Sequence, residues 1–508
     1  MGLILKTKRR AVRAVRRVGE VLAGYEGAKR GRRLDGWTTV SQGSANTEIQ
    51  GSLDMLRARS RDLCRNTWVG RRAINLIANN IVGSSIRPDA KNRDLEQQVL
   101  KWAKRNHCDA DEINSLYGMQ AQIVRTVVES GEALVLREWR TSSEGLPIPI
   151  QLRVIEPDYL DHTFYEKLKN GNQIVQGVEF DRRGRRVAYW LFESHPGDIY
   201  VRGGYPKRRR ISAKDCVHVF DPVRAGQVRG VPWLAPVILI IRGLDEYSDA
   251  QITRQKIAAC YSAFVRKNPE NMWAPTDDAT QNDRPVGERV EPGMIEILEP
   301  GEDVTFGQPP TIEGYHEFTS VTLHGVAAGL GLSYESLTGD YSGVNYSSAQ
   351  MGHEEMTTQI KVWQSHIFLV QLLYPVSDWL LDAAIIMGIA KPEDEIEWTF
   401  PVRAPVDPIK AEKASILRLR AGKSSLEDEI RMAGRDFEDV LDRIQRSNAE
   451  LDRRGIILDS DPRHQNFNGT PRTDGNNAAG AHSPLDPHAH WLDEFLFEDD
   501  EDDDEEKD

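Results

Sequence analysis

The sequence predicts a mainly helical α+β protein that carries a small β-rich portion. Apolar residues recur at steps of three and four over several long segments, which favours amphipathic helices. Between about residues 150 and 225 they alternate with polar residues, which favours strands. The chain has 508 residues, of which 39% are hydrophobic and 28% charged. It is therefore too long for one compact core, and several subdomains of a soluble protein are expected.

In the first half of the chain, helices are expected at residues 50–80 and at about 112–130. The second of these leads into the strand-like segment "EALVLREW". Three further β segments are expected: "QLRVIEPDYLD", a strand running into a turn; "GVEFDRRGRRVAYWLF", a hairpin with the exposed tip "DRRGRR"; and "DCVHVF", a short strand after the basic run "KRRR".

The second half is expected to be largely helical. A long helix begins at Pro232, since proline is tolerated in a first turn. A polar loop at 272–284, the strand "GMIEIL" and a helix at about 316–330 follow. A later helix should be kinked or broken by Pro375. Its apolar seam consists of Met356, Ile360, Trp363, Ile367, Val370 and Tyr374.

Residues 407–455 show three consecutive helices with clear boundary signals. The expected starts are Asp407-Pro408, a capping box of Ser424 with Glu427, and Asp436; the expected stops are Gly422, Gly434 and Gly455. Residues 461–490 have the composition of a low-complexity linker.

Charge is distributed unevenly along the chain. Residues 1–33 hold eleven Lys and Arg against two acids, and residues 493–508 hold twelve acids against one Lys. Such ends are usually solvated and disordered. The alternative is that the basic arm contacts nucleic acid or the acidic face of a partner.

No catalytic, metal or cofactor site can be singled out. "AGKSS" at 421–425 has Leu417 where a phosphate-binding loop needs glycine, so a helix cap is favoured. "HEEMT" at 353–357 has Thr357 where a zinc site needs its second histidine. "GLGLSY" at 329–334 lacks the third glycine of a dinucleotide loop. We therefore expect a protein that is not an enzyme and holds no cofactor.

The chain also lacks clear signs of secretion or membrane insertion. The four cysteines include no CxxC pair, which favours reduced thiols in a cytoplasm. The longest unbroken apolar run, residues 231–241, is too short to span a bilayer. The basic N-terminus has no apolar h-region, so no secretory signal is expected.

The most informative feature is an absence of basic residues. Between Arg289 and Lys361 lie seventy-one consecutive residues without Lys or Arg, although eleven acids occur among them. A buried or partner-covered segment would explain this composition. A surface that guides a moving polyanion would explain it too, because each contact of a Lys or Arg side chain with a phosphate adds binding affinity. The polar segment "LTGDYSGVNYSSAQ" (337–350) lies inside this window.

Five segments together carry a family resemblance. They are "RRAINLIANNIVG" (71–83), "VIEPDYLD" (154–161), "RGVPWLAPVI" (229–238), "LTGDYSGVNYSSAQ" (337–350) and "DPIKAEKASILRLRAGKSSLEDEIRMAGRDFEDV" (407–440). In their order and spacing they resemble the portal proteins of tailed bacteriophages, specifically the lambda-type family. The resemblance extends over roughly residues 50–455.

The resemblance implies a portal-type subunit with wing, stem, clip and crown parts, assembled into a ring with a central channel. The implied parts are a basic N-terminal arm (1–49), the N-terminal part of the wing (50–149), a β-rich clip (150–225), a stem helix (226–266), the C-terminal part of the wing (267–332), a tunnel loop (333–347), a long kinked wing helix (348–400), a helical crown (401–456), and a disordered linker with an acidic tail (457–508).

Two sets of site residues are implied. The DNA-facing tunnel loop would comprise Thr338, Gly339, Asp340, Tyr341, Ser342, Gly343, Val344, Asn345 and Tyr346. The clip would bind acidic partner surfaces through Arg182, Arg183, Arg185, Arg186, Lys207, Arg208, Arg209 and Arg210. A merely solvated hairpin tip is the alternative for this second set.

The resemblance also implies partners and a location. The protein would form a ring of twelve copies at one capsid vertex of the virion, after assembly in the host cytoplasm. It would hold double-stranded DNA in its channel without sequence specificity, and would bind the terminase large subunit, a head–tail adaptor, and the major capsid and scaffold proteins, but no membrane. One alternative is another phage head or head-completion protein without a DNA channel. A second is a nuclease or ATPase of the packaging motor, which the absent phosphate-binding loop disfavours.

Overall fold

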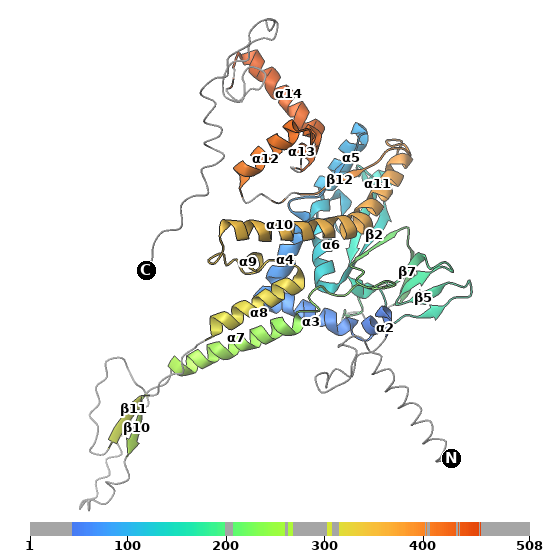
Figure 1. The fold of residues 1–508 in the computed structure, drawn as a ribbon. Coiled ribbons are helices and arrows are strands. Elements are labelled where there is room, and N and C mark those ends of the chain that lie inside the picture. Colours follow the sequence, from blue (N-terminus) through green and yellow to red (C-terminus); the bar gives the residue numbers. More distant parts are fainter. Residues whose placement is uncertain are drawn as a thin grey trace, which may run out of the picture. The chain divides into compact units, whose positions relative to one another are not determined.

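The computed structural model describes residues 43–198, 207–259, 263–267, 302–306, 314–401, 403, 407–432, 435, 437–456 and 458. The chain divides into two compact units, Met1–Arg435 and Asp436–Asp508. The first unit combines helices with small antiparallel sheets (Figure 1). This confirms the mainly helical α+β class.

The expected helix at 50–80 is three helices. They are α2 (Ala45–Gln50), α3 (Leu53–Asn66) and α4 (Trp68–Val82). The chain breaks at Thr67, whose hydroxyl donates to the Leu63 carbonyl at 2.7 Å and accepts from the Gly70 amide at 3.2 Å. This N-cap satisfies an amide that would otherwise lack a partner, so it starts a new helix.

Next come α5 (Arg93–Lys104) and α6 (Leu116–Ser130). The prediction of a helix at about 112–130 is confirmed, with its start moved to the residue after the Ser115 N-cap. A short sheet pairs β1 (Arg87–Asp89) with β12 (Glu397–Thr399), which are far apart in sequence.

The β-rich segment forms two sheets. In the first, β2 (Glu132–Trp139) pairs on its two edges with β3 (Ile150–Ile155) and β9 (Cys216–Phe220). The second has the order β4–β5–β6–β7–β8, and the predicted hairpin is β6 (Val178–Phe180) with β7 (Arg186–Phe192). The remaining strands are β4 (Glu166–Lys167), β5 (Gln173–Val175) and β8 (Arg208–Ser212). Most of the basic run "KRRR" therefore lies in a strand that sequence patterning did not predict.

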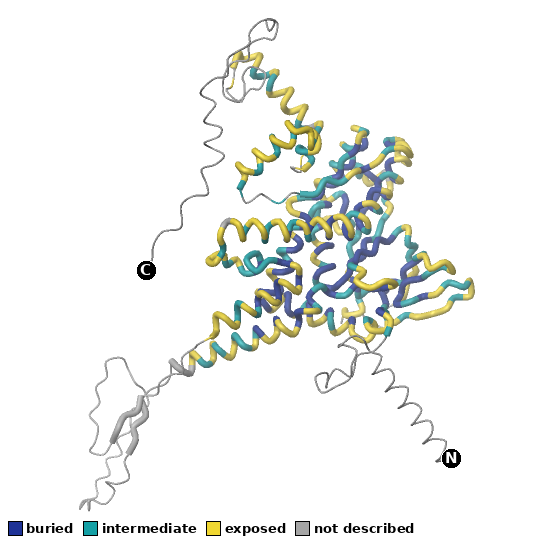
Figure 2. Tube along the Cα trace, in the orientation of Figure 1, coloured by how far each residue is buried: buried dark blue, intermediate teal, exposed yellow. Residues whose placement is uncertain are grey.

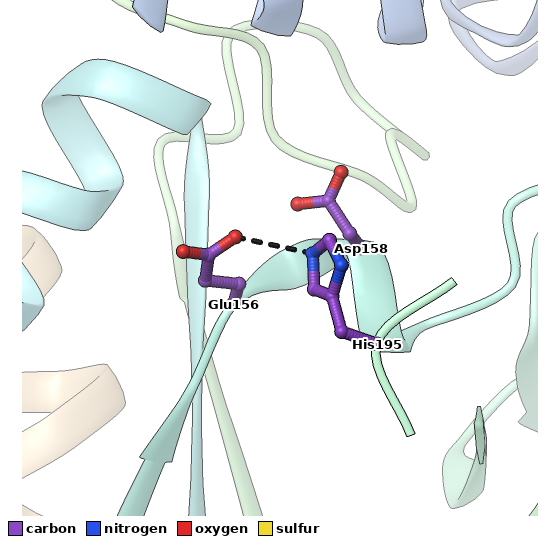
Figure 3. Close-up of side chains that lie close together, drawn as sticks. All are labelled: Glu156, Asp158 and His195. Carbon is purple, nitrogen blue, oxygen red and sulfur yellow. Dashed lines mark ion pairs between the residues drawn. The ribbon is translucent and has the colours of Figure 1, made fainter. Parts of the chain in front are cut away.

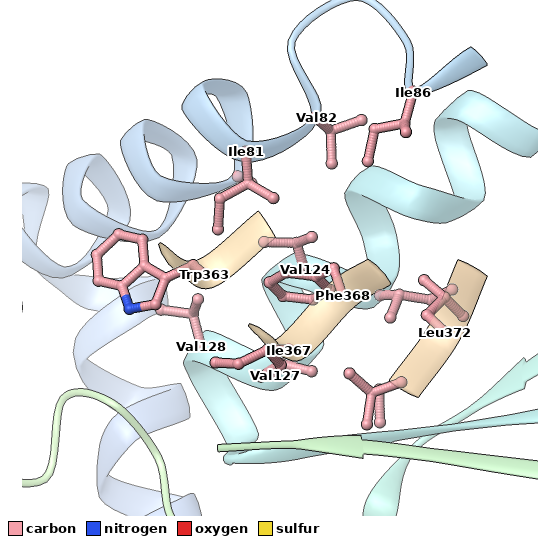
Figure 4. Packing of buried hydrophobic residues seen from close by; sticks show 14 of the residues in the cluster. Ile81, Val82, Ile86, Val124, Val127, Val128, Trp363, Ile367, Phe368 and Leu372 are labelled. Carbon is pink, nitrogen blue, oxygen red and sulfur yellow. The ribbon is translucent and has the colours of Figure 1, made fainter. Parts of the chain in front are cut away.

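The largest core is built around one long helical segment. It consists of α10 (Tyr346–Trp363), a π-helix η7 (Gln364–Leu373) and α11 (Tyr374–Ile386). Figure 4 shows Trp363, Ile367, Phe368 and Leu372 of this segment among side chains of α4 and α6. By length and composition Ser347–Ile386 could cross a membrane. Four residues of its predicted apolar seam, Met356, Ile360, Trp363 and Ile367, pack in this core. The prediction is wrong for Val370 and Tyr374, which are about half-exposed, because the π-helical turns of η7 change the phase of the helix.

The disturbance predicted at Pro375 is a local change of helix type. Pro375 lies in the first turn of α11, and the Tyr374 amide ahead of it bonds to the Leu369 carbonyl, five residues back. Such π-helical turns widen the helix locally. Figure 1 shows the axis turning between α10 and α11.

Two helices that lie far apart in sequence form an antiparallel pair. These are α7 (Ile238–Ala259) and α8 (Tyr315–Leu330). The ring of Tyr247 in α7 contacts Tyr315 and Phe318 of α8, with centroids 5.8 and 4.5 Å apart. The helix expected from Pro232 begins later, at Ile238, after a run of turns.

The far ends of α7 and α8 are joined through a two-stranded sheet. It pairs β10 (Ala263–Lys267) with β11 (Glu302–Phe306). The predicted polar loop at 272–284 and the strand "GMIEIL" lie outside the described residues.

The C-terminal helices are α12 (Pro408–Arg420), α13 (Leu426–Met432) and, in the second unit, α14 (Phe437–Arg454). Asp407 caps α12, and Gly422 follows it with a φ of 66°. The predicted Ser424–Glu427 capping box is wrong by one position, because Ser425 and Asp428 exchange those bonds, at 3.0 Å each way. Gly455, with a φ of 65°, ends α14 as predicted. Gly434 and Asp436 lie outside the described residues.

Candidate functional site

The described part of the base-free window is mostly helical. It contains α8, the short helix α9 (Tyr334–Thr338) and most of α10. The connection that remains between α9 and α10 is residues 339–345, half the length of the segment 337–350 that the sequence drew attention to. The expected tunnel loop is therefore a short connection between two helices.

The first end of this loop is fixed to the core. Leu337 of α9 has no exposed surface and belongs to the main hydrophobic core. Gly339 adopts a φ of 78° and its amide bonds to the Glu335 carbonyl at 2.7 Å, which closes the helix. Tyr334 also stacks on His324 of α8, with centroids 3.9 Å apart.

Hydrogen bonds within the loop define its shape. The Ser342 amide and hydroxyl both donate to Asp340 Oδ1, at 3.0 and 2.6 Å. These two bonds, the hydroxyl bond first, hold the pKa of Asp340 below its ordinary value. Asn345 caps α10 by accepting from the Ser348 amide at 2.9 Å, and Ser348 Oγ accepts from the Asn345 amide at 3.2 Å. The loop thus keeps an ionised carboxylate near its tip.

The tip presents small and aromatic groups to solvent. Ser342, Gly343 and Asn345 are exposed, and Tyr341 is 61% exposed. Thr338, Asp340 and Val344 are half-buried. A surface of this kind offers hydroxyls and one acid but no cation to a phosphate backbone.

Sequence reasoning missed two arginines that lie outside the base-free window and contact the helices on either side of the loop. Arg72 of α4 donates to the Ser336 carbonyl at 3.1 Å. Arg403 donates to the His353 carbonyl and to Thr357 Oγ1, both at 3.1 Å. Arg72 is therefore bonded to α9 and Arg403 to α10, and Arg403 also interacts electrostatically with Tyr341 of the loop. No local sequence signal marks either residue.

The eight predicted basic partner-binding residues divide into two groups. Arg186, Arg208 and Arg210 contact neighbouring parts of the fold. Arg186 donates to His218 Nδ1 at 3.1 Å, Arg208 pairs with Asp161 at 2.6 Å, and Arg210 pairs with buried Glu179 at 2.8 Å. These three arginines are therefore bound largely within the sheet region.

The other five are on the exposed surface of the same sheet. Arg182 donates to the Asn170 carbonyl at 2.9 Å, and Arg185 forms an ion pair with Asp181 at 3.4 Å. Arg183, Lys207 and Arg209 are exposed as well. Arg209 alternates with Arg208 and Arg210 along β8 and so points to the opposite face of the sheet.

A cluster of possible metal ligands, not predicted from sequence, lies at the turn after β3 (Figure 3). Donor atoms of Glu156, Asp158 and His195 lie within 4.8 Å of one another. Arg61 Nη2 lies 2.5 Å from Asp158 and 3.3 Å from Glu156, so a cation already bridges the carboxylates. His195 Nδ1 accepts from the Gly197 amide at 3.0 Å, which leaves Nε2 as the protonated nitrogen of the neutral ring. The donor set fits an ion-pair cluster better than a metal site.

A fully buried charged cluster joins α3, β2, β9 and the segment that precedes α7. The carboxylate of Glu132 on β2 contacts Arg57 of α3, Arg229, and His218 of β9. Burial alone would raise the pKa of Glu132, but the charges of Arg229 and Arg57 hold it well below its usual range. Arg229 also donates to the carbonyls of Leu160, Gln176 and Pro157, at 3.0, 3.1 and 3.2 Å. The cluster is a structural junction, because its side chains are hydrogen-bonded to one another and to carbonyls of the surrounding elements.

The three motifs rejected as cofactor or metal sites lie at helix ends or within a helix. At "AGKSS" the Lys423 amide bonds to the Arg418 carbonyl at 2.9 Å, which is a helix C-cap. In "HEEMT" the Thr357 hydroxyl bonds to the His353 carbonyl within α10. In "GLGLSY" Gly331 ends α8 and Ser333 caps α9.

Residues 30–364 match the sequence profile of the phage portal proteins of the lambda family. The chain belongs to this family. The matched residues include the two sheets of the β-rich segment, the α7/α8 pair and the whole of the α9–α10 loop. The portal resemblance found in the sequence is thereby confirmed.

Relatives of this portal-family chain align over most of its length. A probable portal protein of Halomonas phage phiHAP-1 is 29% identical over an alignment 464 residues long, which covers 85% of this chain and 87% of the relative. Portal protein B of Escherichia phage lambda is 24% identical over 473 residues, with 82% and 88% covered. The portal protein of Escherichia phage N15 is also 24% identical, with 86% and 91% covered.

Two solved structures resemble the portal-family fold more loosely. The neck of a native gene transfer agent particle, computed with C12 symmetry, is 15% identical, has a TM-score of 0.45, and covers 74% of this chain and 93% of the other. An HK97-family phage portal protein from Corynebacterium diphtheriae is 9% identical, with a TM-score of 0.30 and 70% and 98% covered. The family assignment rests on the sequence match.

Proposed function

We propose that this portal protein forms a ring at one vertex of a phage capsid, and that duplex DNA is packaged and later ejected through the central channel of the ring. Family membership supports the assembly. The observation that carries the channel role is the base-free window, which includes the exposed α9–α10 loop. In this proposal the chain acts structurally and carries out no catalytic step of its own.

The loop suits a surface past which DNA moves. A lysine or arginine near a phosphate releases counterions and adds affinity at every contact. Asp340, held ionised by Ser342, opposes such binding, whereas exposed Tyr341 and Ser342 offer only weak, neutral contacts. Residues 338–346 would thus line the narrowest part of the channel without binding the phosphate backbone of the DNA tightly.

The architecture suggests how the portal parts are arranged along the chain. We propose that α7 and α8 form the stem and that the β10–β11 sheet joining them is the clip, because chain connectivity puts this sheet at the far end of the helix pair. Residues 150–225, which the sequence suggested as the clip, share the β2–β3–β9 sheet with the segment expected to be wing. The α10–α11 segment would be the long wing helix and α12–α14 the crown.

The exposed arginines of the second sheet suggest a docking surface for acidic partners. We propose that Arg183, Lys207 and Arg209 contribute to binding the terminase large subunit, the head–tail adaptor, or the capsid and scaffold proteins. Rim charges of this kind mainly change association rates and their salt dependence. The virion, after assembly in the host cytoplasm, is the proposed location.

The channel role is tested by adding charge to the loop. Asp340→Lys with Ser342→Arg should leave ring assembly intact but impair DNA packaging or retention, measured as packaged DNA per particle and as infectivity. Asp340→Gln with Ser342→Gln is the matched control, since it removes the same hydrogen bonds without adding cations. Unchanged packaging in the charged variant, or equal loss in both, would contradict the proposed sliding surface.

A further inference from the structure

The outer side of α10 carries apolar and acidic side chains. The helix buries Met356, Ile360 and Trp363 in the core. Successive residues turn by about 100° around a helix, so four exposed residues lie on the opposite side: Met351, Glu354, Glu355 and Val362. We call these four residues the acidic face. Met351 is 72% and Val362 42% exposed, and Figure 2 shows exposed residues along α10. Apolar surface edged by polar groups is typical of protein–protein contacts.

The carboxylates of the acidic face lack a cationic partner among the residues that the structure describes. Glu354 accepts from the Gln350 side-chain amide at 3.2 Å. His353 lies nearby, but burial lowers the pKa of its ring, so the ring is neutral at pH 7. Lys361, the only Lys or Arg of α10, lies roughly two turns away from these acids. The acidic face can therefore receive cations from another surface.

A second exposed surface, where α3 ends and α4 begins, has the opposite charge. It consists of Arg65, Trp68, Arg71 and Arg72, which we call the basic face. Trp68 is 58% exposed, and Arg72 donates to the Ser336 carbonyl without meeting a carboxylate among the described residues. Arg65 and Arg71 lie near half-buried Glu129, and neither forms an ion pair with it. Tryptophan and arginine are among the side chains that most often dominate the affinity of an interface.

The two faces point away from the core that α4 and α10 share. Figure 4 shows Ile81 of α4 and Trp363 of α10 in that core. Trp68 and Arg72 lie on the side of α4 opposite its buried residues, as the acidic face does on α10. Each copy thus presents two unlike surfaces of opposite charge, and both include exposed apolar groups. Neighbouring copies in a ring meet through two different surfaces, because such a contact is heterologous.

We infer that the basic face of one copy docks on the acidic face of the next copy in the ring. Trp68 and Met351 supply the apolar centre of this contact, and the arginines lie beside the carboxylates of the neighbour. The inference rests on the proposed ring and names the two surfaces that close it.

This contact also accounts for part of the base-free window. A lysine or arginine in the first turns of α10 would meet the arginines of the neighbouring copy, and like charges across an interface weaken it. The window then serves two purposes: the α9–α10 loop faces DNA, and α10 faces the next subunit.

Charge reversal on each side tests the contact in the full-length protein. Arg72→Glu or Glu355→Arg alone should raise the protein concentration needed for ring formation about tenfold or more, because like charges then meet. The double variant should form rings at nearly the original concentration, because opposite charges meet again. Native mass spectrometry over a dilution series measures the fraction of protein in rings. Lys101→Glu, an equal reversal at an exposed position of α5, is the control and should have no effect.

The outcomes separate this inference from the proposed ring. Loss in both single variants with recovery in the double variant supports the contact. Rings at unchanged concentration in both single variants, or no recovery in the double variant, would overturn the inference and leave the ring standing. An unmodified protein that stays monomeric would overturn both.

A nucleic-acid surface is the alternative role for the basic face. In that case Arg72→Glu and Arg65→Glu would weaken the binding of a short DNA duplex and reduce its salt dependence, while ring formation stayed as in the unmodified protein. Fluorescence anisotropy with a labelled duplex at two salt concentrations measures this binding. Such a result would overturn the subunit contact.

Discussion

Arg229 Nε lies 2.7 Å from Glu132 Oε1, and neither side chain has any exposed surface. This pair connects β2 to the segment that leads into α7, and Arg57 and His218 complete the cluster around the carboxylate. Glycines next to both residues allow the close approach, since a Cβ on Gly230 would lie 2.1 Å from the Gly131 carbonyl oxygen. The proposed stem is thus anchored to the body through buried charge.

Glu132→Gln should destabilise the protein strongly. The change leaves two buried guanidinium groups without their shared counter-charge, and breaking such a pair costs about 3–5 kcal/mol. The midpoint of urea unfolding, followed by tryptophan fluorescence, measures the effect. Glu246→Gln, which breaks an exposed pair with Arg242, is the control and should cost at most about 1 kcal/mol. Similar effects of the two changes would contradict a structural role for the cluster.

His218 should make stability depend on pH. Burial is the main cause that lowers the pKa of His218 to about 4. The attraction of Glu132 opposes this shift, and the charge of Arg186 adds to it. Between the ordinary histidine pKa of about 6.5 and the folded value, the unfolded chain binds a proton that the folded chain does not. Stability is therefore complete above about pH 6.5 and falls by up to about 3 kcal/mol as the pH drops toward 4.

The His218→Gln variant separates this effect from other titrating groups. Its unfolding midpoint should vary less with pH between 6.5 and 4.5 than that of the original protein. Below that range the depressed pKa of Glu132 adds a further loss as the carboxylate is protonated. An equally steep profile in the variant would assign the pH dependence to other residues.

Arg209 and Arg210, adjacent on β8, should behave differently when changed. Arg210→Gln removes the partner of buried Glu179 and should lower the free energy of unfolding by about 1 kcal/mol, since the guanidinium is itself half-exposed. Arg209→Gln should leave stability unchanged and instead weaken the salt-dependent binding of an acidic partner. Surface plasmon resonance with the purified terminase large subunit, at two salt concentrations, measures the second effect. A loss of binding confined to Arg210→Gln would contradict the proposed docking surface.

Local patterns predicted much of this fold. The β6–β7 hairpin was predictable because its two strands alternate around a charged turn, and the ends of α12 and α14 because Asp407, Gly422 and Gly455 act through their own backbone neighbours. The break at Thr67 was not, because an apolar face continues across it. The start of α13 was not predictable to one residue, because Ser424–Glu427 and Ser425–Asp428 have the same spacing and only the second pair forms the cap.

The site was predictable only in part. The absence of Lys and Arg between Arg289 and Lys361 is visible in the sequence. The described residues confirm a loop between helices. The support from Arg72 and Arg403 was not predictable, because each arginine reaches its partner through tertiary packing. The same holds for the buried cluster, where Glu132 and Arg229 are separated by 97 positions in the chain.

Electron microscopy of the purified full-length protein tests the central claim most directly. The account predicts rings of one defined symmetry with an open central channel wide enough for duplex DNA, roughly 20 Å. The α7/α8 pair should project from one side of the ring, and the α9–α10 loop should lie at the narrowest part of the channel. A monomer, or an assembly without a central channel of that width, would contradict it.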